Sequence, residues 1–293
     1  MKIKIVDTDS KIPNLALMKV SAYHKSKGDM VSFGIPDPDK VIASVVFREN
    51  AWKARGLQFM YPDAEIEIGG PGWNLSKRLP DEIEFIKPDY DLYPSEYSLG
   101  FTTRGCIRKC PFCIVPEKEG KIQRWQHIKE FHDSRFDTVI CLDNNIYADR
   151  DWFFENTDYV LEHRLKFNAI QGMDIRILTP EIAERLKAIR WSGQYHFAFD
   201  NMADEAAVKA GISMLKDAGI NTRHDVTFYV LVGFNTTEEE DKYRCRLLKE
   251  LKTNAFVMQY KRTDWTRKIA WWANRKEAFW ACDVDEVDRR VRA

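Results

Sequence analysis

The stretch SLGFTTRGCIRKCPFC (Ser98–Cys113) places a strand-like segment directly before a loop that carries three of the chain's six cysteines. Cys106, Cys110 and Cys113 fall within eight positions of one another. A structural zinc site normally has four protein ligands, and so does an iron–sulfur cluster that only transfers electrons. Three clustered cysteines therefore predict a metal centre that keeps one coordination position open for a small molecule.

The composition is that of a soluble globular protein. Hydrophobic residues make up 44% and charged residues 31% of the 293 positions, and 45 basic residues balance 45 acidic ones. The chain therefore lacks the excess of positive charge that would favour sequence-independent binding of nucleic acid. The first residues, MKIKIVDTDS, lack the apolar core of a signal peptide, and apolar runs such as YVLVGF are far shorter than the roughly 18 residues of a membrane span. Clustered cysteines indicate metal chemistry in a reducing compartment, so we expect a cytoplasmic protein.

Strand and helix patterns alternate regularly after residue 96. The strand candidates are Ser98–Gly105, Phe136–Asn145, Phe167–Leu178, Gln194–Asn201, His224–Phe234 and Asn254–Tyr260. The helix-like segments between them are Asp151–His163, Pro180–Ala188, Asp204–Ala218 and Glu238–Leu251. This order predicts a parallel α/β barrel, or part of one, over residues 96–262, with active residues at the carboxyl ends of the strands. Residues 263–293 predict a helical, aromatic extension that packs on the barrel.

A smaller α/β pattern precedes the barrel over residues 1–95. Its strand candidates are Lys2–Asp7, Lys40–Phe47 and Ala64–Gly72, and a helix-like segment covers Pro13–Lys27. The glycine-rich bend IGGPG follows the last strand, as in parallel α/β units that bind ligands. Prolines and tyrosines recur at irregular spacing over Lys87–Tyr97, without the periodicity of a helix or a strand. This pattern indicates a linker to the second domain.

The pattern CxxxCxxC, with the aromatic Phe112 before its last cysteine, resembles the cluster-binding motif of the radical S-adenosylmethionine (radical SAM) enzymes. The wider stretch RGCIRKCPFCIVPEKEG is similar to the cluster loop of the cobalamin-type and methylthiotransferase-type branches of that family, and the resemblance covers about Ser98–Arg262. It implies a partial (β/α)6 TIM-like barrel that holds a 4Fe–4S cluster by three cysteines. It also implies that S-adenosyl-L-methionine binds to the open iron.

In that family, one electron from the cluster cleaves S-adenosylmethionine into methionine and a 5′-deoxyadenosyl radical, which abstracts hydrogen from the substrate. The resemblance thus implies a low-potential electron donor of the flavodoxin or ferredoxin kind. Methyl transfer, sulfur transfer and rearrangement of the substrate all fit this chemistry. The substrate class stays open between a small molecule, a peptide and a tRNA base.

Carried over to this chain, the resemblance assigns the cluster ligands to Cys106, Cys110 and Cys113. The expected cofactor-binding residues lie in the loop or at the ends of predicted strands, and they are Phe112, Asp143, Asn144, Gln171, Asp174, Arg176, Asp200 and Gly233. Phe112 matches the aromatic residue beside the adenine, and Gly233 matches the glycine of the fifth-strand motif. The family's Gly-Gly-Glu motif is replaced by the sequence DNN, so the contact to the methionine amine is not assigned.

Residues 1–95 resemble the Rossmann-like cobalamin-binding domain that precedes the barrel in one branch of the family. They lack the Asp-x-His-x-x-Gly pattern that supplies a histidine ligand to cobalt, since His24 lies four positions before Gly28. We therefore expect a scaffold domain without cobalamin. The alternative is that cobalamin binds without a protein ligand.

A second class of function is a non-catalytic protein in which His127 or His132 completes a zinc site with the three cysteines. The tail YKRTDWTRKIAWWANRK (Tyr260–Lys276) mixes cations with tryptophans, as in surfaces that stack nucleic-acid bases. The same pattern fits an amphipathic helix whose tryptophans pack on the barrel. The remaining cysteines stand singly on apolar elements and predict small buried side chains rather than a second cluster; they are Cys141, Cys245 and Cys282.

Overall fold

The computed structural model of the chain describes residues 1–287. Strands and helices alternate and the larger sheets are parallel, so the predicted α/β class is confirmed. The strands are β1 (Lys2–Asp7), β2 (Met30–Ser32), β3 (Lys40–Ser44), β4 (Glu65–Gly69), β5 (Ser98–Gly100), β6 (Thr103–Arg104), β7 (Gln123–Arg124), β8 (Thr138–Cys141), β9 (Lys166–Ala169), β10 (Arg190–Trp191), β11 (Tyr195–Ala198), β12 (Val226–Val232) and β13 (Asn254–Gln259).

The helices and 3₁₀ turns complete the order of elements. The α-helices are α1 (Leu15–Ser26), α2 (Ala51–Arg55), α3 (Leu57–Met60), α4 (Asp81–Glu84), α5 (Val115–Lys118), α6 (Ile128–Phe131), α7 (Arg150–Glu162), α8 (Pro180–Ala188), α9 (Glu205–Asp217), α10 (Thr222–Asp225), α11 (Glu238–Glu250), α12 (Asp264–Ala273) and α13 (Lys276–Ala281). The 3₁₀ turns are η1 (Arg48–Asn50), η2 (Ile175–Ile177), η3 (Met202–Asp204) and η4 (Val284–Glu286). Within residues 1–287, no helix is both long enough and apolar enough to cross a membrane.

The chain divides into two compact units. Unit 1 consists of Met1–Phe101 and Gln126–Val139, whereas unit 2 consists of Thr102–Trp125 and the chain from Ile140 onward. The second segment of unit 1 interrupts unit 2 in sequence, which the local patterns do not reveal. The predicted domains 1–95, 96–262 and 263–293 stay predictions.

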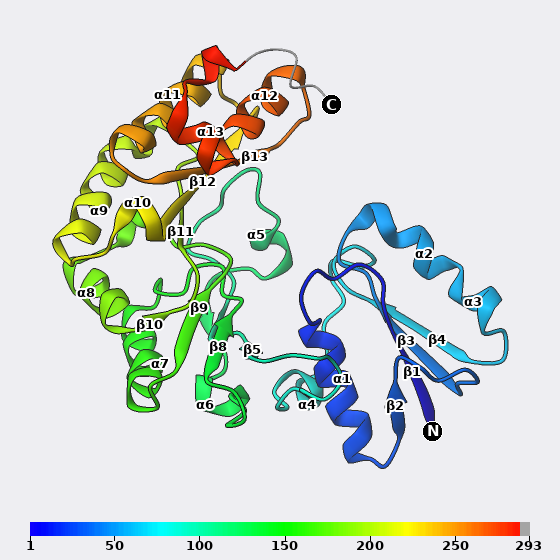
Figure 1. The fold of residues 1–293 in the computed structure, drawn as a ribbon. Coiled ribbons are helices and arrows are strands. Elements are labelled where there is room, and N and C mark those ends of the chain that lie inside the picture. The colour runs from blue at the N-terminus through cyan, green and yellow to red at the C-terminus, as the bar shows by residue number, and fades with distance from the viewer. Residues whose placement is uncertain (288–293) are drawn as a thin grey trace. The chain divides into compact units, whose positions relative to one another are not determined.

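Unit 1 is built on a four-stranded parallel sheet in the order β2-β1-β3-β4. Side chains of β3 alternate between its two faces. Ile42 joins the cluster with Met18 of α1, and Val41 joins the cluster with Ala54 and Leu57 of α2 and α3. Helices therefore cover both faces of this sheet (Figure 1).

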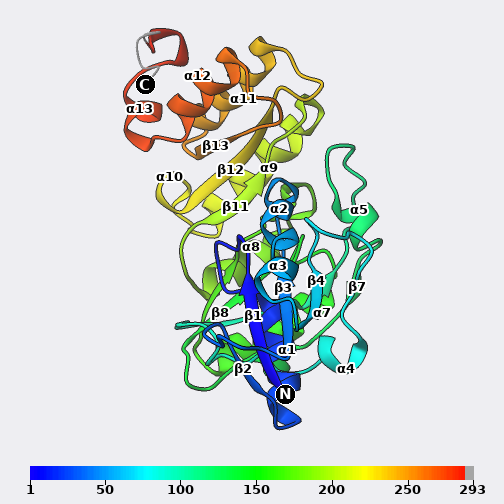
Figure 2. The same cartoon turned by 90° about the vertical axis from the view of Figure 1, so that its right-hand side faces the viewer.

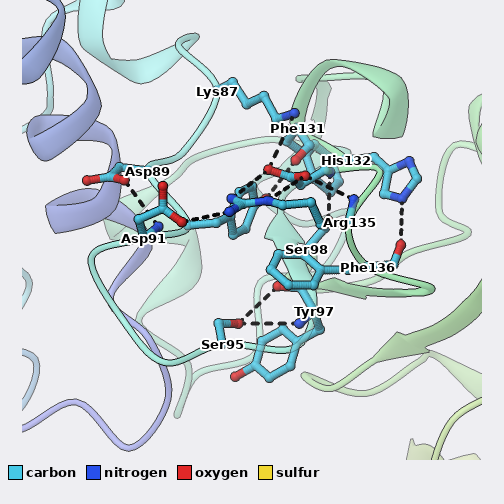
Figure 3. A network of polar contacts seen from close by, with 12 residues as sticks. Lys87, Asp89, Asp91, Ser95, Tyr97, Ser98, Phe131, His132, Arg135 and Phe136 are labelled. Carbon is cyan, nitrogen blue, oxygen red and sulfur yellow. Dashed lines mark hydrogen bonds and ion pairs between the residues drawn. The ribbon is translucent and has the colours of Figure 1, made fainter.

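Polar contacts attach the second segment of unit 1 to the first. The Arg135 guanidinium donates to Asp91 at 2.7 Å (Figure 3) and binds Asp133 at 3.0 Å. The hydroxyl of the buried Tyr90 donates to the carbonyl oxygen of Phe131 at 2.6 Å. These contacts explain why the segment belongs with the N-terminal unit although it is remote in sequence.

Unit 2 carries two runs of neighbouring strands. In the run β10-β9-β8, β10 and β9 pair in parallel, and all strands of the run β11-β12-β13 are parallel. Met173, which follows β9, forms a parallel bridge with Phe197 of β11 and so joins the two runs. Every residue of the central strand β12 except Tyr229 is buried, as is typical of a parallel strand that is covered on both faces. Helices α7, α8, α9 and α11 follow one another along the outer side of these strands (Figure 1).

The predicted helices of this part of the chain are present as α7, α8, α9 and α11, and Pro180 stands in the first turn of α8 as predicted. The strand that we predicted to reach Leu178 is too long, since β9 ends at Ala169. The Asp174 side chain accepts the backbone N–H of Arg176 and thereby starts the 3₁₀ turn η2.

The C-terminal extension packs on β13 through α12 and α13 (Figure 2). The Asn274 side chain accepts the N–H of Val257 at 2.6 Å and donates to its carbonyl oxygen at 3.1 Å. Trp272 is fully buried, and the indole N–H of Trp280 donates to Asn254 at 3.0 Å. The predicted helical extension is present as α12 and α13, while the part of the prediction over residues 288–293 lies outside the described residues.

A buried arginine connects α11 to the ends of two strands. Arg244 is 0% exposed and donates to the carbonyl oxygens of Phe199 at 2.7 Å and Leu231 at 2.9 Å. Its guanidinium also binds the carboxylate of Asp241 at 2.6 Å. These groups are removed from water, so each depends on the others for its hydrogen bonds.

Replacing Arg244 with methionine leaves a buried carboxylate without its cation and two carbonyl oxygens without donors. We expect the free energy of unfolding of Arg244→Met to fall by about 3–5 kcal/mol, measured by urea denaturation followed by circular dichroism. The control is Arg267→Met, because the Arg267–Asp264 pair is mostly exposed and its loss costs less than about 1 kcal/mol. Equal effects of the two substitutions would contradict this account of α11.

Candidate functional site

A cavity of about 660 Å³ lies in unit 2 beside the cysteine loop and the segments that follow β8, β9, β11 and β12. These segments leave the carboxyl ends of parallel strands, where a sheet of this kind places its ligands. Most of the predicted site residues line the cavity; they are Cys106, Cys110, Phe112, Cys113, Asn144, Gln171, Asp174, Arg176 and Asp200. Asp143 and Gly233 are not among the lining residues.

The start of the cysteine loop is held by a glycine and a carboxylate. Gly105 has a φ of +79°, and a Cβ atom at this position would collide with the carbonyl oxygen of Lys121. The N–H of Gly105 donates to Glu119 Oε2 at 3.0 Å. Asn144 Nδ2 donates to the same oxygen at 2.8 Å and to the carbonyl oxygen of Gly105 at 3.2 Å. The amide of Asn144 thus fixes the loop in addition to lining the cavity.

The three thiols differ in exposure. Cys113 is exposed, whereas Cys106 and Cys110 are half-buried. The N–H of Cys113 donates to the carbonyl oxygen of Cys110 at 3.0 Å, and the N–H of Arg108 donates to Cys106 Sγ at 3.4 Å. Burial raises the pKa of Cys110, and the positive charge of Arg176 opposes that rise.

The described part of the chain contains no group of three or more His, Cys, Asp or Glu side chains in an arrangement that would hold a metal ion. The three thiols share one cavity wall without converging on a point. As a donor set, three sulfur atoms on one short loop suit iron in a cluster that keeps one coordination position open.

Asp143 is fully buried at the end of β8 and binds the chain that leads into the cysteine loop. Its carboxylate accepts the backbone N–H of Thr102 at 3.0 Å and the hydroxyls of Thr102 and Thr103 at 2.7 Å each, as well as the N–H of Thr103. Burial raises the pKa of Asp143, and these donors oppose the rise. The carboxylate is therefore engaged by four protein donors, away from the cavity surface.

Asn145 offers an unpaired donor in the cavity wall. Its side chain is 3% exposed, and its Oδ1 accepts the N–H of Asp174 at 3.3 Å. This bond directs the other end of the amide away from Asp174, and Nδ2 has no hydrogen-bond partner within residues 1–287. A ligand with an oxygen acceptor would satisfy this group.

A chain of ion pairs runs along the cavity. Arg108 Nε donates to Asp174 Oδ2 at 2.7 Å, and Arg176 Nε donates to Asp174 Oδ1 at 2.6 Å. Arg176 also binds Asp204 at 3.2 Å. Burial would raise the pKa of Asp174, but the guanidinium groups of Arg176 and Arg108 bring it below its usual range. Asp174 and Arg176, which we expected to bind the cofactor, thus neutralise each other.

Asp200 has no cation bound to its carboxylate in the described part of the chain. Its Oδ1 accepts the N–H of Leu231 at 2.8 Å, and burial raises its pKa. Phe112 lies edge-on to Phe234 with ring centroids 5.4 Å apart. Gly233, just before Phe234, has a φ of +76°, so it turns the chain at the cavity edge without lining the cavity.

We did not predict several of the residues that line the cavity, namely Asp204, Tyr229, Asn235, Thr236 and Glu240. Asp204, Asn235, Thr236 and Glu240 follow the ends of β11 and β12, so the rule that selected Asp200 also applies to them. Tyr229 lies inside the apolar strand β12 and stacks on His196 with an interplanar angle of 5°. A polar hydroxyl within an otherwise apolar strand is the feature of the sequence that could have marked Tyr229 as a site residue.

The other sulfur and imidazole groups have separate surroundings. Cys141 and Cys245 are buried as predicted, whereas Cys282 is only partly buried and donates to a backbone carbonyl. The two histidines considered as zinc ligands belong to unit 1. His127 Nδ1 accepts the N–H of Lys129, and His132 Nε2 binds the carbonyl oxygen of Phe136 (Figure 3).

Comparison of the chain with models of protein families and with curated proteins found no match.

The lowered pKa of Asp174 makes stability depend on pH. A carboxyl whose pKa is lower in the folded state stabilises the fold above its unfolded pKa of about 3.9, and this contribution disappears as the pH falls through the folded value. Asp174→Asn is expected to lower the free energy of unfolding at pH 7, with the difference from wild type shrinking below about pH 4. Urea unfolding at both pH values tests this, with the exposed Asp217→Asn as control. A difference that does not change with pH would be inconsistent with an ionised, paired Asp174.

Proposed function

We propose that this chain is a radical SAM enzyme that binds a 4Fe–4S cluster through Cys106, Cys110 and Cys113 and reductively cleaves S-adenosyl-L-methionine. One observation carries the proposal. Three thiols from a single loop line one cavity together with polar residues from the ends of several parallel strands. A cavity of about 660 Å³ falls in the range of sites that hold cofactor-sized ligands, roughly 300–1,000 Å³.

The order of strands and helices along the chain supports this proposal. Parallel strands that alternate with α7, α8, α9 and α11 fit the partial (β/α)6 barrel inferred from the sequence. The strand order of unit 1, with helices on both faces of the sheet, fits a Rossmann-like domain. His24 is bound to Asp29 at 2.8 Å, so we propose a scaffold role for unit 1 and disfavour cobalamin.

The residues of the cavity fit the cofactors by their chemistry. Thiolates are the usual ligands of iron–sulfur clusters, and the loop offers only three of them. When bound, the cluster would supply the electron that divides S-adenosylmethionine into methionine and a 5′-deoxyadenosyl radical. Asn145 Nδ2 would donate to an oxygen of the bound ligand, and Asp200 would accept from a hydroxyl or an amine.

The aromatic side chains would serve to exclude water from the reaction. Phe112 and Phe234 form one pair at the cavity edge, and Tyr260 packs against Phe234 with ring centroids 4.7 Å apart. A reactive radical must meet its substrate before it meets solvent, and apolar side chains at the cavity edge favour this. We further propose a flavodoxin-like or ferredoxin-like electron donor and a location in the cytoplasm.

The alternative function is a non-catalytic zinc-binding or nucleic-acid-binding protein. Two observations disfavour it. Both candidate histidines hydrogen-bond within unit 1. Trp272 is fully buried, and the indole N–H groups of Trp265 and Trp280 donate to side chains of α11 and β13. The content of metal and sulfide separates the two functions directly.

The first test is the cluster itself. Anaerobically reconstituted protein is expected to carry about four irons and four sulfides per chain and to absorb broadly in the visible range. Cys110→Ala is expected to lose most of this iron, because it removes one of three ligands. The matched control is Cys282→Ala, since this cysteine does not line the cavity. A colourless protein with about one zinc per chain would refute the proposal.

The second test is the reaction. With a strong reductant and S-adenosylmethionine, the reconstituted wild type is expected to release 5′-deoxyadenosine and methionine, measured by liquid chromatography. Cys113→Ala is expected to reduce this release to background, whereas Cys282→Ala should retain it. Undiminished release from Cys113→Ala would show that the assigned ligands are wrong.

A further inference from the structure

We propose that Asp174 is a positioning residue that holds the cysteine loop in place through Arg108, so that the loop is ordered before its ligand arrives. The inference rests on the proposed function for the identity of that ligand, a metal cluster. The link itself is a property of the protein without metal.

Arg108 is placed to act on the whole loop. It lies between Cys106 and Cys110, and its Nε donates to Asp174 Oδ2 at 2.7 Å. The Asp174 side chain is 8% exposed, whereas that of Arg108 is 36% exposed. A charge-assisted hydrogen bond to a largely buried carboxylate is stronger than one between two exposed side chains. The bond therefore ties the middle of the loop to the segment after β9.

Asp174 is itself fixed from three other directions. Its backbone N–H donates to Asn145 Oδ1 at 3.3 Å, and its carbonyl oxygen accepts the hydroxyl of the buried Tyr147 at 2.9 Å. Its second carboxylate oxygen accepts from Arg176 at 2.6 Å. Each of these partners belongs to unit 2, so Arg108 is bound to a rigid point of the same unit that carries the cavity.

The neighbouring cation, Lys109, lacks such a link. It lines the same cavity, but among residues 1–287 no carboxylate forms an ion pair with it. The two adjacent cations of the loop thus have different roles. Arg108 restricts the backbone, whereas Lys109 contributes charge alone.

The physical reason for such a link is the cost of ordering. Bringing three thiolates to one metal centre fixes the backbone of the residues between them, and each fixed residue costs conformational entropy. A loop that Arg108 already holds meets part of this cost during folding. The loop is then partly ordered before a ligand binds, and the thiols still have to converge when it does.

Amide hydrogen exchange of the metal-free protein tests the link. The N–H groups of Cys106 and Cys113 are protected by bonds within the loop region, and they lie far enough from position 108 to keep their intrinsic rates. Arg108→Ala is expected to speed their exchange by about tenfold relative to wild type, while β12 stays unchanged. Lys109→Ala is the matched control and should have no such effect, and Arg108→Lys should restore part of the protection.

A double-mutant cycle shows whether Asp174 is the partner. In the Asp174→Ala background, Arg108→Ala is expected to produce little further acceleration, because the bond is already lost. Equal exchange rates in Arg108→Ala and Lys109→Ala, or independent effects of Arg108 and Asp174, would overturn the inference. If the wild type bound no iron while the exchange still depended on Arg108, the proposed function would fail and the positioning role would stand.

Discussion

The hydrogen bonds of one buried carboxylate underlie the geometry of the candidate site. Asp143 at the end of β8 binds both backbone N–H groups and both hydroxyls of Thr102 and Thr103, the two residues that lead into the cysteine loop. Hydrogen bonds to a charged group contribute about 1.5–3 kcal/mol each, and water cannot replace them at a fully buried position. Asp143 therefore sets where the loop begins, and the contacts of Gly105 and Arg108 then determine its course.

The fold follows largely from periodicity in the sequence. Apolar runs such as Val226–Val232 and the proline at position 180 identify strands and helices, because burial and the start of a helix depend on local sequence. The end of β9 and the membership of Gln126–Val139 in unit 1 could not be found in this way. After β9 the chain enters the 3₁₀ turn η2, which the Asp174 side chain caps, and the membership of Gln126–Val139 depends on contacts with residues distant in sequence, such as that of Arg135 with Asp91.

For the candidate site too, the sequence predicts the positions of residues better than their contacts. The rule that ligands gather at the carboxyl ends of parallel strands predicts that Asn144, Gln171 and Asp200 lie near the cysteines, and they line one cavity with them. That rule does not predict which side chain forms an ion pair or hydrogen bond with each charged residue. A carboxylate at a strand end can face a ligand or another side chain, and only the three-dimensional arrangement shows that Thr102 engages Asp143 and Arg108 engages Asp174.

The side chain of Asn274 has a consequence for how these molecules behave at high concentration. Its amide occupies both backbone hydrogen-bonding groups of Val257 on the outer margin of β13. An open margin of a sheet can recruit a strand from another molecule and so begin uncontrolled self-association. The Asn274 amide occupies these two groups, so a strand from another molecule cannot pair with β13 at Val257.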